Sequence, residues 1–78
     1  MTPSERRERL LEWLSDPTFL ATAGVTVSYV YHCSGGPTGL GPEYRDMAEA
    51  RYDLNTLERA GKLRRIHLSR PARWEVVR

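Results

Sequence analysis

Apolar residues recur at helical spacing near the start of the chain. The apolar side there consists of Leu10, Leu11 and Leu14, with Trp13 at its margin. The alternating charges of Glu5–Arg9 are expected to cover the solvent side. Thr2–Glu5 has the order of a capping box, and Asp16-Pro17 is a typical stop, because the residue before a proline is pushed away from helical geometry. The pattern therefore predicts a first helix that packs through its leucines.

A second helical pattern runs from about Glu43 to Ala60. Its buried stripe is expected to be Met47, Ala50, Leu54 and Leu57. Pro42 suits its first turn, and Gly61 is typical of a left-handed cap after its last turn. The other side presents mostly polar residues, namely Arg45, Glu49, Tyr52, Thr56 and Arg59, with Arg51 and Asn55 at its shoulders.

The segment between these helices has two interpretations. Val25–Cys33 is rich in β-branched and aromatic residues, which favours a strand. A short helix capped by Thr26 would instead place Val27, Val30 and Tyr31 on one side. The residues alone leave both open. Ser34–Pro42 is glycine-rich, but no Gly-Lys-Ser/Thr follows it, so a connector is favoured over a phosphate-binding loop.

The C-terminal segment has the pattern of a β-hairpin. Leu63–Leu68 is expected as one arm and Trp74–Val77 as the other, with Pro71 in the second position of the turn. Alternation would turn Ile66, Leu68, Trp74 and Val76 inward, and Arg65 and His67 outward.

Length and charge refine this picture. Seventy-eight residues fit one domain, which we take as residues 1–78. The formal net charge is only +2, but residues 62–78 carry six basic residues against Glu75 alone, while the expected helix before them is net negative. The cationic end indicates a polyanionic partner.

Several classes of function are disfavoured. No apolar run would span a bilayer, and the N-terminus lacks the features of a signal peptide, so we expect a cytoplasmic protein that does not engage membranes. The lone Cys33 with His32 and His67 has no zinc spacing, and no nucleophile has a base at a typical distance. We therefore expect neither an enzyme nor a metal, cofactor or small-molecule substrate.

The stretch Tyr52–Arg65 resembles the end of the recognition helix and the start of the wing in winged helix-turn-helix domains. Two leucines three apart are followed there by a small residue, a glycine, an apolar residue and basic residues. The resemblance implies an α+β fold, a small winged helix-turn-helix with three helices followed by a C-terminal β-hairpin wing. It also favours a helix at residues 26–33. The connector Ser34–Pro42 is longer than the tight turn usual at that point.

In that family the third helix enters the DNA major groove and the wing touches the backbone. The resemblance thus implies binding of double-stranded DNA, sequence-specific or led by the wing, as in a small bacterial or phage transcription regulator. The implied DNA-binding residues are Arg45, Arg51, Tyr52, Asn55 and Arg59 on the helix, and Lys62, Arg64, Arg65, Arg70 and Arg73 on the wing. Arginine can fork onto guanine, and asparagine can pair bidentately with adenine. A homodimer or a protein partner would strengthen weak binding by a monomer.

Each of these residues also has a plainer interpretation. Exposed arginines on a helix are commonly a solvated face that pairs with nearby carboxylates, and Tyr52 would equally cover an edge of the core. The helix's own acidic residues argue against a conventional repressor, unless they turn away from DNA. Asp46 and Asp53 lie one heptad apart and could share a side that faces the arginines of the first helix. The alternative function is a winged helix that serves as a protein-interaction adaptor and binds no DNA.

Overall fold

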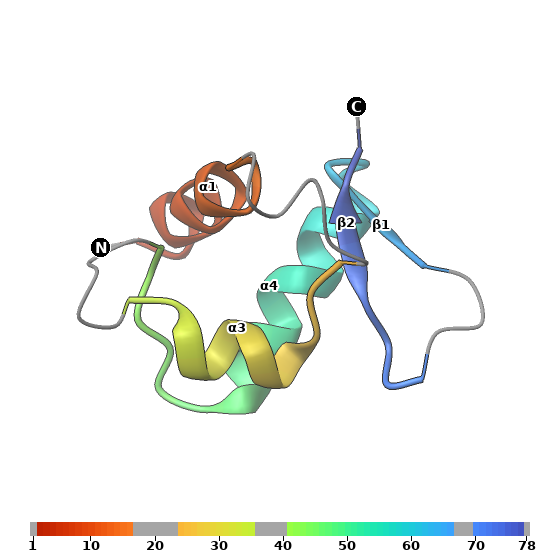
Figure 1. Cartoon of the computed structure of the whole chain (residues 1–78). Helices are drawn as coiled ribbons and strands as arrows, with labels where there is room; N and C mark the ends of the chain where they lie inside the picture. The colour runs from red at the N-terminus through yellow and green to blue at the C-terminus, as the bar shows by residue number, and fades with distance from the viewer. Residues whose placement is uncertain (1, 17–23, 36–40, 67–69, 78) are drawn as a thin grey trace.

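The structure, a computed structural model, describes residues 2–16, 24–35, 41–66 and 70–77 (Figure 1). In these residues three helices precede a two-stranded antiparallel hairpin: α1 (Pro3–Leu14), α3 (Val27–Cys33), α4 (Met47–Arg59), β1 (Leu63–Arg65) and β2 (Trp74–Val76). This confirms the predicted α+β class and its order of elements. The predictions for Pro17, for most of the connector at 36–40, and for His67 and Leu68 lie outside the described residues. None of the described helices has the length and apolar character to span a bilayer.

Helix α1 begins and packs nearly as its sequence predicts. The Thr2 hydroxyl accepts a hydrogen bond from the Glu5 backbone N–H at 3.1 Å, and Pro3 lies in the first turn. Leu10 and Leu14 are buried, and Trp13 belongs to the core rather than to its margin. The expectation that all the charges of this helix face solvent is wrong, because Arg6 and Arg7 turn toward α4.

Residues 27–33 form a helix, which decides between the two interpretations of this segment. The Thr26 hydroxyl caps it by accepting the Tyr29 backbone N–H at 3.1 Å, and Val27 and Val30 are buried. The strand that the β-branched residues favoured is reduced to one residue just before the helix, because Val25 makes a single antiparallel bridge to Trp74 of the hairpin. The extended signal therefore belongs to one residue, and the helix begins two positions later.

Helix α4 begins later than predicted, with Asp46 rather than Pro42 at its start. The Asp46 carboxylate accepts the Glu49 backbone N–H at 2.8 Å and so caps the first turn. Met47, expected in the buried stripe, is 39% exposed, and the buried side chain at this end is Tyr44 in the preceding segment. Ala50, Leu54 and Leu57 are buried as predicted.

The end of α4 leads directly into the hairpin. Gly61 has a φ of 76°, and the backbone N–H groups of Gly61 and Lys62 bond to the carbonyls of Glu58 and Leu57 at 3.0 and 2.9 Å. This is a Schellman cap, and it confirms the predicted role of Gly61. Because the chain turns at this cap, β1 follows α4 directly and packs in contact with it (Figure 1).

The hairpin corrects the predicted facing of two residues in its first arm, Arg65 and Ile66. Leu63 pairs with Val76 and Arg65 with Trp74, so Arg65 lies on the same face as the buried Leu63 and Trp74. Arg65 is exposed, as expected, but its guanidinium lies 4.9 Å from the Trp74 ring centroid rather than on the other face of the hairpin. Ile66, expected to face inward, is only half-buried and lies beside Gly24. In the turn, the Arg70–Pro71 peptide bond is cis.

Candidate nucleic-acid interface

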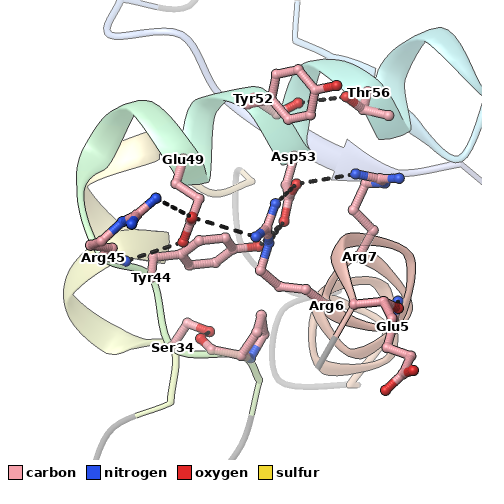
Figure 2. A network of polar contacts seen from close by, with 12 residues as sticks. Glu5, Arg6, Arg7, Ser34, Tyr44, Arg45, Glu49, Tyr52, Asp53 and Thr56 are labelled. Atoms are coloured by element: carbon pink, nitrogen blue, oxygen red, sulfur yellow. Dashed lines mark hydrogen bonds and ion pairs between the residues drawn. The ribbon is translucent and has the colours of Figure 1, made fainter.

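The inner side of α4 carries a buried carboxylate, Asp53, that ties three parts of the chain together (Figure 2). Its oxygens accept hydrogen bonds from the Arg6 guanidinium at 2.7 and 2.8 Å and from the Tyr44 hydroxyl at 2.8 Å. Arg7 lies 3.6 Å away. Asp53 is fully buried, and a buried carboxylate is tolerated only when its charge is balanced and its oxygens are hydrogen-bonded. This network fixes which side of α4 faces the core.

The surroundings of Asp53 shift the pKa of two of its partners. Burial, together with the hydrogen bond to Asp53, raises the pKa of the Tyr44 hydroxyl well above its usual value. The hydrogen bond to Asp53 likewise raises the pKa of the Arg6 guanidinium, which favours its charged form. The network is therefore one carboxylate held by a permanent cation and a neutral phenol.

The raised pKa of Tyr44 predicts a loss of stability in alkali. A tyrosine of the unfolded chain ionises near pH 10, while Tyr44 in the fold retains its proton to higher pH. The unfolded chain then binds fewer protons, so the contribution of Tyr44, complete below about pH 10, is lost as the pH rises above it. We expect Tyr44→Phe to lower the free energy of unfolding by about 1–2 kcal/mol at pH 7, and to flatten the decline above pH 10.

Urea denaturation between pH 7 and pH 11.5, roughly one and a half pH units beyond the usual tyrosine pKa, measures this effect. Tyr52→Phe is the matched control, because the Tyr52 side chain is 60% exposed and its hydroxyl is not in the Asp53 network. An unchanged alkaline decline in Tyr44→Phe would contradict the prediction.

The remaining acidic residues of α4 also have partners within the protein. Asp46 caps the helix. Glu49 lies 3.5 Å from Arg6 and 3.6 Å from Arg45 (Figure 2). Glu58 accepts the Trp74 indole N–H at 2.8 Å and lies 3.3 Å from Arg65. Glu49, Asp53 and Glu58 therefore have arginine partners, and Asp46 is engaged by the helix backbone, which weakens the main sequence argument against an anionic partner.

The outer side of α4 brings together most of the helix residues named from the sequence. Arg51, Tyr52 and Arg59 are exposed, and Asn55 is half-buried beside them. Among the residues described, the guanidinium groups of Arg51 and Arg59 form no ion pair. Arg45 is highly exposed but lies at the start of the helix, where it pairs with Glu49.

The basic residues of the hairpin divide into two groups. Arg64 pairs with Glu75 on the neighbouring strand, its Nε 2.9 Å from the carboxylate. Arg65 pairs with Glu58 and donates to the Asn55 side-chain carbonyl at 2.9 Å. Within the described ranges, the charged groups of Lys62, Arg70 and Arg73 make no ion pair. Two of the five wing cations named from the sequence are thus engaged by carboxylates.

Asn55, Glu58, Arg59 and Arg65 line a small open pocket of about 240 Å³ where α4 meets β1. It joins the outer side of the helix to Arg65 of the hairpin, so Asn55, Arg59 and Arg65 belong to one continuous surface. We use the name α4–wing face for these residues together with the exposed neighbours Arg51, Tyr52 and Lys62.

Sequence reasoning allowed Asp53 to face the arginines of the first helix, as it does, but did not identify the buried network that organises this surface from beneath. Asp53 stands three residues after Ala50 and one before Leu54, so it lies in the buried phase of the helix. The position of this acidic residue on the buried side of the helix was the sequence signal that could have identified it. The partners Arg6 and Tyr44 lie outside α4, and Arg6 is 47 positions away from Asp53.

The described part of α3 offers no metal site. His32 and Cys33 are exposed neighbours, and no group of three potential ligands occurs among the described residues.

Comparison with known proteins adds no relative: no protein family model, no characterised protein and no solved structure matches the chain. Assignment of function therefore depends on the chemistry of the α4–wing face.

Proposed function

We propose that the chain is a winged helix-turn-helix domain that binds double-stranded DNA through the α4–wing face, as a small transcriptional regulator in the cytoplasm. The observation that carries the proposal is the division of charge around α4. Its carboxylates are paired with partners inside the protein, while Arg51, Arg59 and Lys62 are exposed without carboxylate partners in the described structure. Such an arrangement suits a polyanion, since cations that lack internal partners are available to phosphates.

The order of the elements supports the same proposal. A helix with an exposed polar side, followed at once by a hairpin, is the arrangement with which winged helices meet DNA. The exposed side of α4 carries arginine, tyrosine and asparagine, which are side chains suited to phosphates and base edges.

The dependence of binding on salt tests the proposal. If Arg51, Arg59, Lys62 and one further cation of the hairpin each neutralise a phosphate, the logarithm of the affinity for a random duplex falls with the logarithm of salt concentration at a slope of about −3.6. Fluorescence anisotropy of a labelled duplex from 20 to 200 mM salt, roughly the range in which such slopes are read, gives the value. Absence of duplex binding at the lowest salt would overturn the proposal and favour a protein-interaction adaptor.

A further inference from the structure

We propose that the pocket between α4 and β1 is a subsite for one phosphate group of the DNA backbone, and that Arg65 is its main ligand. The inference rests on the proposed function and deepens it, because it assigns a phosphate to one place on the α4–wing face. The sequence offered Arg65 as one of several equivalent wing cations, whereas its contacts in the fold set it apart from the others.

Arg65 is fastened to α4 along one edge of its guanidinium. Nη2 donates to Asn55 Oδ1 at 2.9 Å, and Nε lies 3.3 Å from Glu58 Oε1. Nε and Nη2 form one edge of the planar group, and both of their partners belong to α4. The guanidinium also lies over the Trp74 ring, 4.9 Å from its centroid. Three neighbours therefore hold a side chain that is still 49% exposed.

The same contacts leave the outer edge of the Arg65 guanidinium open. The group has five N–H donors, and Nη1 has no partner among the described residues. Nη1 and the second proton of Nη2 form a fork that fits two oxygens of a phosphate. Because the side chain is already held, binding costs less conformational entropy than it does for a mobile arginine. Arg65 is thus a stronger phosphate ligand than an unrestrained surface cation.

The pocket supplies a second cation beside Arg65. Asn55, Glu58, Arg59 and Arg65 line an open space of about 240 Å³. Arg59 comes from the last turn of α4 and makes no ion pair within the described ranges. Glu58, the acidic member of these four, is engaged by the Trp74 indole N–H at 2.8 Å and by Arg65. Two guanidinium groups beside one engaged carboxylate favour an anion in this space.

Arg64 provides a matched comparison on the same strand. It pairs with Glu75 across the hairpin, and its side chain is 70% exposed. Both arginines thus have a carboxylate partner, but Arg64 does not line the pocket and is not fastened to α4. A difference between them in DNA binding reports the pocket rather than the charge of the strand.

The first test removes the fork and keeps the charge. Arg65→Lys is expected to weaken duplex binding roughly tenfold, because it loses a charge-assisted bidentate contact. The salt slope should not change, since lysine still neutralises the phosphate. Arg64→Lys should change the affinity by less than about twofold. Anisotropy titrations with several duplexes of unrelated sequence, and a thermal melt of each variant, measure both effects.

A second measurement needs no substitution and so does not depend on how the variants fold. Inorganic phosphate is titrated into the unsubstituted protein at low salt while NMR follows the Nε–Hε groups of the arginines. The signal of Arg65 should shift saturably, because its guanidinium lines the subsite, and the signal of Arg64 should shift little.

An equal loss of affinity in the two lysine variants would overturn the inference. A loss confined to some of the sequences would also overturn it, because a phosphate contact weakens binding uniformly and a base contact does not. Equal phosphate shifts at Arg64 and Arg65, or no shift at either, would contradict it as well. In each case the proposed function would stand as long as the unsubstituted protein binds duplexes. A protein that binds no duplex at the lowest salt would overturn the proposed function, and a subsite for DNA phosphate with it.

Discussion

Arg6→Met is expected to lower the free energy of unfolding by about 3 kcal/mol at neutral pH, the largest effect of any single substitution that we predict. The variant retains the aliphatic stem but leaves Asp53, which is fully buried, without its bidentate cation. Tyr44 and Arg7 remain, but one hydrogen bond and one guanidinium at 3.6 Å do not balance the cost of a buried carboxylate. Urea denaturation at pH 7 measures the loss.

Arg9→Met is the matched control for this prediction, because Arg9 is exposed on the same helix. It should change stability by less than about 0.5 kcal/mol. Adding Asp53→Asn to Arg6→Met should recover part of the loss, since a neutral amide costs less to bury than an ion. A loss below about 1 kcal/mol in Arg6→Met would show that the Asp53 network does not hold α1 and α4 together.

The parts of this fold that local chemistry determines were predictable from the sequence. Thr2 begins the first helix by capping it, and Gly61 ends the third by adopting a left-handed conformation. Each effect is complete within one turn of helix. The leucines at 10 and 14 and at 54 and 57 are buried because helical periodicity alone places them on one side.

The errors arose where contacts distant in sequence outweigh local pattern. Pro42 was a suitable first residue for α4, yet Asp46 caps the helix and Tyr44 is drawn into the core by its bond to Asp53. Arg65 is exposed, as alternation predicted, but the register of the hairpin pairs it with Trp74 and puts both side chains on one face. The sequence pattern predicted a turn around Pro71 but did not determine the pairing register of the two arms.

The candidate site shows the same division. Residue types and helical spacing correctly brought Arg51, Tyr52 and Arg59 to one exposed side. The net charge summed along the helix gave too negative a picture of that side. Its carboxylates are bound by residues from α1, from the segment before α4 and from the hairpin. Charge must be counted on a surface rather than along a segment before it indicates a partner.

Replacing Arg51, Arg59 and Lys62 together by glutamine is expected to weaken binding to a random duplex roughly a hundredfold at 0.1 M salt. The salt slope should become shallower by about 2.7, since each phosphate contact contributes about 0.9. All three side chains are exposed and lack carboxylate partners among the described residues, so the variant should retain its fold. Anisotropy titrations at several salt concentrations, with a thermal melt of each protein, measure both effects.

The single variants Arg59→Gln and Arg9→Gln make the matched comparison, because both remove one exposed arginine from a helix. Arg59 lines the pocket between α4 and β1, whereas Arg9 belongs to α1. If the α4–wing face meets DNA, Arg59→Gln loses about one unit of salt slope and Arg9→Gln loses none. Equal losses would mean that the protein attracts DNA through its overall charge alone, because a defined interface distinguishes a contacting guanidinium from a distant one.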